Sequence, residues 1–438
     1  MLLASARHVQ GVLAGRSLSE LLADTPGPVR PAAQAISFHA MRRLGLAMAL
    51  RNQLLRGAPP GPLFDGLLLV SLALLDTAAA LAADPQAEAP RRTAEPRYQV
   101  HTVVDQAVNA AAGYRKLAGF RGLLNACLRR FLRERQGLLD AALQTPEGRY
   151  NHPAWWVQRL QKAYPEQWEA LLEAANQPPP MVLRVNRRRC DRDTLLAQLT
   201  QHGTPAWPVQ EAAVVLASPR PVHEIPGFAE GWWSVQDLSA QQAGRLLPVR
   251  DGDYVLDACA APGGKTAHLL ERASLRLLAL DADAARLARV GETLDRLGLS
   301  GPHVTLQCAD AGALDTWWNG ESFDAVLADV PCTASGVVRR HPDIRWLRRQ
   351  ADIGRTASVQ RRLLDALWKT VRPGGHLLYA TCSFFPEEGE QQVQAFVQRT
   401  TDAVRLDAPG QILPLAQAQS ADAVTGDGFF YALFVKRA

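Results

Sequence analysis

DYVLDACAAPGGKT, residues 253–266, is the stretch from which the rest of this chain is interpreted. Its first half is apolar up to Asp257 and predicts a short buried strand. Its second half predicts a tight glycine turn followed by a helix from Thr266 onward. Such turns let backbone N–H groups approach a ligand, and the N-terminus of the following helix favours negative charge. The stretch therefore predicts a ligand-binding turn between a strand and a helix.

Three kinds of ligand can be weighed against this turn. A P-loop for nucleoside triphosphates requires G-x-x-x-x-G-K-[ST], but Cys259 stands where the first glycine belongs. A dinucleotide site requires G-x-G-x-x-G, and Pro262 interrupts that pattern. The third ligand is S-adenosylmethionine (SAM), whose carboxylate, ribose and adenine require a backbone turn and then acidic residues at successive strand ends. SAM is favoured because those acidic residues are present.

Three aspartates follow predicted strands. Asp281 closes the apolar run 277–280, about twenty residues after the turn, where an acid binds two ribose hydroxyls. Asp310 follows the predicted strand 304–308 and is a candidate for the adenine amino group, and Asp329 ends the run 325–328. Each alone is more often a helix cap or a turn residue. Three of them at the ends of consecutive strands indicate a cofactor site.

The bulk properties set the compartment and the number of domains. A chain of 438 residues can hold two or three domains, and its formal charge of +5 permits an anionic partner. The six cysteines include no C-x-x-C pair, so we predict no metal site and a reducing compartment. The N-terminus suits an amphipathic helix better than a signal peptide. The apolar run 67–83 carries Asp76 and predicts a buried helix. We expect a cytoplasmic protein without membrane contact.

Residues 1–140 predict a wholly helical domain. Apolar residues recur at helical spacing over 4–23, 35–55, 63–82, 100–111 and 117–132, with proline-rich breaks at 26–31, 59–62 and 85–96. A further helix over 154–175 ends at three consecutive prolines. A strand over 181–186, a helix over 192–202 and a strand over 213–217 then predict a small α+β subdomain within residues 141–245.

From Gly252 onward strands and helices alternate, which is typical of a parallel sheet covered on both faces. We therefore predict an α/β domain of Rossmann-like type over residues 246–438. The last run, 429–435, has no helix after it and is expected to close the sheet as an antiparallel strand. The expected elements are 253–259, 265–272, 275–281, 284–297, 304–308, 323–329, 358–370, 376–380, 388–400 and 429–436.

Two cysteines lie just past predicted strand ends. Cys332 ends the sequence Asp-Val-Pro-Cys, and Cys382 lies in Thr-Cys-Ser after the strand 376–380. In an open parallel sheet such residues face the ligand crevice. A single cysteine is usually a small buried hydrophobic residue. Two of them beside a predicted SAM turn instead indicate that thiol chemistry takes place there.

Methylation of a pyrimidine at carbon 5 is a reaction that needs a thiolate and SAM together. Carbon 5 is not nucleophilic in the aromatic ring, so a thiolate first adds to carbon 6 and creates an enamine that attacks the methyl group. A nearby cation or hydrogen-bond donor would raise the thiolate fraction. Asp329 is a candidate for contact with the Watson–Crick edge of the base. These residues alone do not decide whether Cys332 or Cys382 is the nucleophile.

The motifs DACAAPGGKT (257–266), DVPC (329–332) and TCS (381–383) together resemble the RNA (cytosine-5) methyltransferases. The segment 332–349, the DGFFYA ending and the helical N-terminal domain look like the bacterial 16S ribosomal RNA enzymes of the RsmB/Sun type. The similarity covers nearly the whole chain. It implies a monomer with a NusB-like RNA-binding domain over residues 1–140, acting on 16S ribosomal RNA before or during subunit assembly.

The resemblance also implies roles for individual residues. It implies Cys382 as the nucleophile, with Cys332 assisting product release. We further expect five arginines after Cys332 to contact RNA, namely Arg339, Arg340, Arg345, Arg348 and Arg349. The proline-rich segment 85–96 is longer than the resemblance leads us to expect. The implied SAM contacts are Cys259, Ala260, Ala261, Pro262, Gly263, Gly264, Lys265, Asp281, Asp310 and Asp329.

Overall fold

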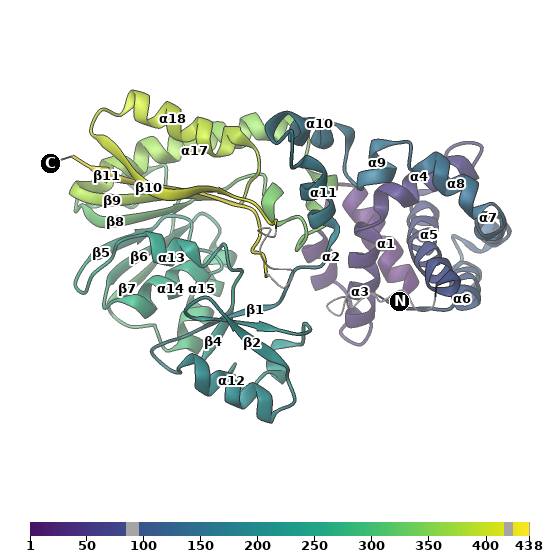
Figure 1. Cartoon of the computed structure of the whole chain (residues 1–438), viewed down its shortest axis with the longest axis horizontal. Coiled ribbons are helices and arrows are strands. Elements are labelled where there is room, and N and C mark those ends of the chain that lie inside the picture. Colours follow the sequence, from purple (N-terminus) through teal and green to yellow (C-terminus); the bar gives the residue numbers. More distant parts are fainter. Residues whose placement is uncertain (85–95, 416–423, 438) are drawn as a thin grey trace. The chain divides into compact units, whose positions relative to one another are not determined.

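The computed structural model describes residues 1–84, 96–415 and 424–437. The predicted break at residues 85–96 falls outside the described residues except for its last position. The chain forms two compact units (Figure 1). The helical unit comprises Met1–Pro178 and Val338–Gln350, and the sheet unit comprises Pro179–Val337 and Ala351–Ala438.

The described residues of the helical unit form helices joined by loops, and none of them forms a strand. Three stretches that the sequence predicted as single helices are each divided in two. The first divides at Gly15, whose φ of 98° lies in the left-handed region, and the third divides before Pro165, which lacks a backbone N–H. The α-helices are α1 (Leu2–Leu13), α2 (Leu18–Ala23), α3 (Arg30–Met41), α4 (Leu44–Leu54), α5 (Pro62–Ala83), α6 (Val100–Ala112), α7 (Arg121–Arg133), α8 (Arg135–Ala142), α9 (Pro146–Tyr150), α10 (Ala154–Ala163), α11 (Trp168–Asn176) and α16 (Ile344–Leu347).

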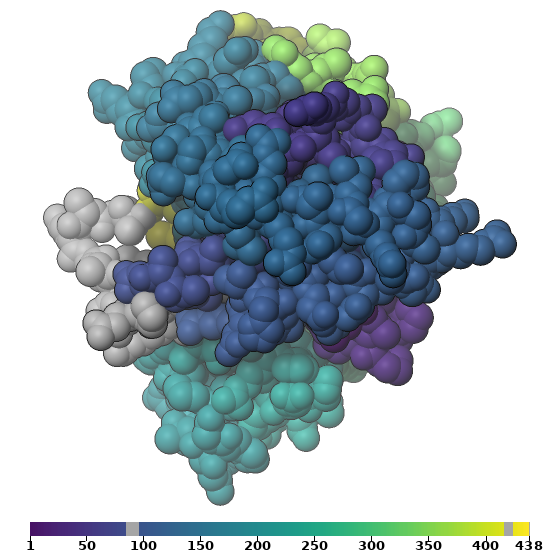
Figure 2. Space-filling model, turned by 90° about the vertical axis from the view of Figure 1, so that its right-hand side faces the viewer, coloured from purple at the N-terminus to yellow at the C-terminus, as the bar shows by residue number. Residues whose placement is uncertain are grey.

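Helix α5 is the core of the helical unit. By length and composition it could cross a membrane, but most of it is buried inside the protein, as predicted for residues 67–83. Helices α1, α3, α4, α6 and α7 contact it from several sides. Figure 2 shows one surface of this unit, on which purple N-terminal segments lie beside blue segments from later helices. A helix that is apolar all round is thus explained by helices that surround it.

A small antiparallel sheet opens the sheet unit. Its strands are β1 (Val182–Val185), β2 (Ala206–Val209), β3 (Ala213–Leu216) and β4 (Trp233–Val235), in the order β2-β3-β1-β4. Helix α12 (Arg192–Gln201) contacts β2 and β3. The predicted elements at 181–186, 192–202 and 213–217 are therefore present. Strand β2 was not predicted because it contains Pro208, which is tolerated there at the edge of the sheet.

The large sheet has seven strands in the order β10-β11-β9-β8-β5-β6-β7. Strands β9 (Val371–Thr381), β8 (Phe323–Asp329), β5 (Tyr254–Asp257), β6 (Arg276–Asp281) and β7 (Val304–Cys308) are parallel. Helices α13 (Gln242–Leu246), α14 (Gly264–Arg272) and α15 (Ala284–Leu297) cover one face, and α17 (Gln350–Thr370) and α18 (Glu390–Arg399) cover the other (Figure 1). This mixed sheet confirms the predicted α/β architecture.

Strand order reverses at β5, because β6 and β7 follow on one side while β8 and β9 follow on the other. Ligands of open α/β sheets bind at such a reversal, outside the carboxyl ends of the strands. Strand β11 (Phe429–Lys436) is antiparallel to β9, as predicted, but it does not form the edge. The edge is β10 (Ala403–Ile412), which was not predicted because charged residues and Pro409-Gly410 interrupt its apolar pattern.

Candidate active site

The turn after β5 has the backbone that the sequence predicted. Gly263 has a φ of 97°, and a Cβ atom there would lie 3.1 Å from the Cα atom of Val290. Only glycine suits this position. Helix α14 begins at the next residue, so the N–H groups of its first turn have no acceptor within the helix. These donors fit the carboxylate of the methionine part of SAM.

The acids at the ends of β6 and β7 lie along the same edge of the sheet. Asp281 is 4% exposed and accepts hydrogen bonds from the N–H groups of Ala261 (3.3 Å) and Asp283 (3.0 Å). Its carboxylate is thereby fixed beside the turn. Asp310 is more open, accepts from the N–H of Gly312 (2.9 Å) and forms an ion pair with Arg362 (3.1 Å). Both lie where a nucleoside would follow the turn.

Lys265 connects the turn to the end of β8. Its ammonium lies 2.5 Å from Oδ2 of Asp329 and 5.1 Å from the ring centre of Phe429. Burial lowers the pKa of Lys265, but the charge and hydrogen bond of Asp329, together with Cys382 and Asp257, outweigh this effect, and the net shift of the pKa is upward. Lys265 therefore carries a positive charge next to the predicted base-contacting acid.

The P-loop alternative loses support at Thr266. In a P-loop this hydroxyl binds Mg²⁺. Here it is 0% exposed and donates to Oδ2 of Asp257 at 2.7 Å. Burial raises the pKa of Asp257 to about 7, despite this hydrogen bond. The Gly-Lys-Thr sequence thus serves to anchor α14 and to place Lys265.

The two cysteines lie together at the ends of adjacent strands. Cys332 follows β8 and Cys382 follows β9, and their sulfur atoms are 3.3 Å apart. The hydrogen bond to Cys382, burial and the Glu388 carboxylate raise the pKa of Cys332 well above its ordinary value. Cys332 therefore keeps its proton at neutral pH and can donate it to the sulfur of Cys382. Cys382 lies close enough to Lys265 that it contributes to the raised pKa of the Lys265 ammonium.

Glu388 was not identified from the sequence, yet it holds both cysteine-bearing loops. It is 0% exposed and follows β9 in the short 3₁₀-helix Pro386–Glu388. Its carboxylate accepts from the N–H of Thr333 (2.9 Å) and from the hydroxyls of Thr333 (2.5 Å), Ser383 (2.5 Å) and Thr356 (2.6 Å). Thr333 follows Cys332, and Ser383 follows Cys382. The hydroxyl residue that follows each cysteine was the sequence signal from which a shared hydrogen-bond acceptor could have been predicted.

Two of the five arginines expected to contact RNA are buried. Arg345 is 0% exposed and donates to the carbonyl oxygens of Asn151 (3.2 Å) and Ala175 (2.7 Å) within the helical unit. Burial lowers its pKa to about 9. Arg339 is 5% exposed. The expectation of RNA contact is therefore wrong for these two, because their side chains are buried in the helical unit, to which the segment Val338–Gln350 belongs.

Comparison with protein families gives two matches. The model described as 16S rRNA methyltransferase RsmB/F matches residues 245–435. A model described as the ferredoxin-like domain of RsmF/B-like methyltransferases matches residues 152–223. The first match contains the turn, the three acids and both cysteines of the site.

Whole-chain comparisons agree with the family matches. The chain is 41% identical to ribosomal RNA small subunit methyltransferase B of Vibrio cholerae over 99% of this chain and 96% of that protein. It is 46% identical to the protein of the same name from Klebsiella pneumoniae over 78% of each chain. The crystal structure of PH0851 covers 100% of this chain and 99% of its own, with a TM-score of 0.74 and 22% identity. That likeness shows a shared fold.

Proposed function

Because this chain belongs to the RsmB/F family of SAM-dependent 16S rRNA methyltransferases, we propose that it methylates carbon 5 of one specific cytosine through a covalent cysteine–cytosine bond. The observation that carries this proposal is the sulfur pair, 3.3 Å apart, at the ends of β8 and β9. A thiol pair beside a cofactor turn suits a reaction in which one sulfur adds to the base and the other assists its departure.

Cys382 is the nucleophile in this proposal. Its thiolate adds to carbon 6 of the cytosine, and the resulting enamine makes carbon 5 nucleophilic. SAM, when bound, supplies the electrophilic methyl group. After methyl transfer, a general base takes the proton from carbon 5, and the electron pair of that bond forms the double bond between carbons 5 and 6 as the bond between carbon 6 and Cys382 breaks, which restores the aromatic ring. Cys332, which keeps its proton, donates to the departing sulfur of Cys382.

The SAM contacts come from the turn and the strand ends. The turn residues Cys259, Ala260, Ala261, Pro262, Gly263, Gly264 and Lys265 surround the methionine part. Asp281 binds the ribose hydroxyls, and Asp310 binds the adenine amino group. Asp329 contacts the Watson–Crick edge of the cytosine as well as lining the SAM site. The ion pair between Asp329 and Lys265 supports this role because it fixes the carboxylate at the end of β8, between the turn and the loop that carries Cys332.

The remaining parts of the chain recognise the RNA. We assign residues 1–140 to a NusB-like RNA-binding domain, 141–245 to the linker helix and α+β subdomain, and 246–438 to catalysis. Arg129 and Arg133 on α7 are exposed and suit phosphate contact, whereas Arg135 pairs with the buried Asp76 at 2.6 Å. The enzyme acts as a cytoplasmic monomer on 16S RNA before or during assembly.

The test is transfer of labelled methyl from SAM to unmodified 16S ribosomal RNA, followed by bisulfite mapping. The proposal expects label at a single cytosine that then resists bisulfite. Label at another base, or SAM binding without any label in the RNA, would contradict the proposed reaction.

A further inference from the structure

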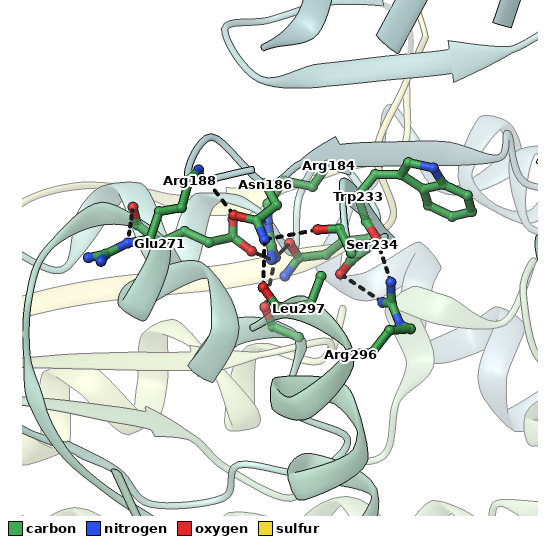
Figure 3. Close-up of polar contacts among 11 residues, drawn as sticks. Arg184, Asn186, Arg188, Trp233, Ser234, Glu271, Arg296 and Leu297 are labelled. Carbon is green, nitrogen blue, oxygen red and sulfur yellow. Dashed lines mark hydrogen bonds and ion pairs between the residues drawn. The ribbon is translucent and has the colours of Figure 1, made fainter. Parts of the chain in front are cut away.

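Arg184 is a buried arginine that no part of the proposed chemistry uses. It lies in β1 of the small sheet and is 1% exposed. Its guanidinium reaches helix α14, which covers one face of the large sheet (Figure 3). Nε and Nη2 donate to the carboxylate of Glu271 at 3.0 and 2.6 Å, and Nη1 donates to the carbonyl oxygen of Gly264 at 2.7 Å. Nη1 also donates to the side chain of Gln236.

These acceptors lie at the two ends of α14. Gly264 is the first residue of the helix and Glu271 is the last but one. The carbonyl of Gly264 shares a planar trans peptide with the N–H of Lys265, and the two groups point in opposite directions. A donor that fixes the carbonyl therefore also aims the Lys265 N–H, which belongs to the first helical turn. Arg184 thus sets the direction of a donor at the cofactor turn.

Stability alone does not account for this ion pair. Burial raises the pKa of Glu271, although Arg184 acts in the opposite direction. A buried ion pair is often no more stabilising than apolar residues of the same volume. A flat guanidinium, however, can hold a carboxylate with two donors and a carbonyl with a third, which no apolar side chain can do.

We propose that Arg184 is a positioning residue for SAM, and that the small sheet is thereby a part of the cofactor site. The inference rests on the proposed assignment of residues 259–265 to SAM. It gives the subdomain a role in cofactor affinity in addition to any contact with RNA.

Arg296 offers a matched control in the same interface. It lies on α15 and donates from Nη1 to the carbonyl oxygens of Phe228 (2.9 Å) and Trp233 (3.1 Å) (Figure 3). Nearby, Asn186 donates to the carbonyl of Leu297 at 3.1 Å. These hydrogen bonds also join the small sheet and its loops to a helix that covers the large sheet. They involve the C-terminal end of α15 rather than the turn at Gly264.

The experiment compares Arg184→Lys with Arg296→Lys by calorimetric titration with SAM and by thermal unfolding. A lysine keeps the charge but cannot span Glu271 and Gly264 together. We expect Arg184→Lys to raise the Kd for SAM about tenfold, the scale of one lost hydrogen bond to a charged group. We expect Arg296→Lys to lower the melting temperature while the Kd for SAM stays within about twofold of the wild-type value.

Equal SAM affinity in the two variants would overturn the inference. If Arg184→Lys does not fold, the double variant Arg184→Met with Glu271→Leu removes both charges together, and it should fold yet bind SAM about tenfold more weakly. Normal affinity in that double variant would also overturn it. Asp281→Ala separates this failure from that of the cofactor assignment. If Asp281→Ala too binds SAM normally, the assigned site itself is wrong, whereas weakened binding there leaves only the role of Arg184 refuted.

Discussion

Cys332 and Cys382 differ in their charged neighbours, and this difference supports their proposed roles. Besides its hydrogen bond to Cys382 and its burial, Cys332 experiences the negative charge of Glu388, and all three raise its pKa. Cys382 instead lies near the Lys265 ammonium. The strand-end positions alone left the choice of nucleophile open, and the family resemblance implied Cys382. Position could not decide because Glu388 and Lys265 approach the thiols only in the folded protein.

Replacement of Asp281 tests the SAM site. Asp281→Ala removes a fixed carboxylate, and we expect it to weaken SAM binding by roughly 1.5–3 kcal/mol while RNA binding is retained. Asp283→Ala is the control, because the Asp283 side chain only caps α15 by accepting from Ala285 and Arg286. Calorimetry should show normal SAM affinity for the control. Unchanged affinity in folded Asp281→Ala would remove Asp281 from the cofactor site.

The buried Asp257 predicts a pH effect on stability. Its pKa rises from 3.8 to about 7 on folding, because burial penalises the charged form. Between these values the unfolded chain releases this proton while the folded chain keeps it, so Asp257 lowers the stability as pH rises from about 4 to 7. Asp257→Asn removes this contribution, which amounts to at most about 4 kcal/mol. Urea unfolding at pH 5 and 7.5 should show that the free energy of unfolding of Asp257→Asn rises relative to that of the wild type as the pH rises. The same difference in unfolding free energy between the two proteins at both pH values would contradict a raised pKa of Asp257.

The strands of the large sheet could be predicted because most of them are buried on both faces and are therefore continuous apolar runs. Strand β10 could not be, since its exposed edge position requires no such run. The helix breaks after Leu13 and Ala163 depend on single turn residues that periodicity does not weigh. Glu388 was missed for a different reason, because its donors come from residues 333, 356, 360 and 383, which only the sheet topology brings together.

Glu388→Gln tests whether the two loops must be held by a carboxylate. The glutamine amide has one oxygen that accepts hydrogen bonds and one NH2 group that only donates them. It therefore cannot accept all of the hydrogen bonds that the two carboxylate oxygens of Glu388 accept. We expect kcat to fall about tenfold or more through displacement of the two sulfurs. SAM affinity should not change, because Glu388 contacts the loops and not the turn. Glu390→Gln is the control, since Glu390 pairs with Arg405 at the surface. Equal kcat values for both variants would refute the positioning role.

RNA affinity is expected to be distributed over many phosphate contacts of this basic chain. Of the five arginines after Cys332, Arg345 instead stabilises the helical unit through four acceptors. Arg349 is exposed, and Arg340 and Arg348 are partly exposed. These three remain candidates for RNA contact. A charge run read from the sequence cannot separate such roles, because burial decides between them.

Salt titrations of RNA binding should separate the two groups of arginines. Each phosphate-contacting arginine that is replaced by alanine should reduce the slope of log K against log salt concentration by about one. We expect this for Arg340, Arg348 and Arg349. Arg345→Met should leave the slope unchanged but lower the melting temperature, since buried carbonyl groups lose their donors. A slope unaffected by replacement of all three would favour a solvated charged surface.

The covalent mechanism is tested most directly by denaturing electrophoresis of the two cysteine variants with 16S ribosomal RNA and SAM. If Cys382 attacks carbon 6 and Cys332 assists its departure, Cys332→Ala should form the bond but fail to break it. That variant should remain attached to RNA through denaturation, whereas Cys382→Ala and the double variant should show neither adduct nor methyl transfer. An adduct with Cys382→Ala and none with Cys332→Ala would reverse the two roles, and full activity in both single variants would contradict the covalent mechanism itself.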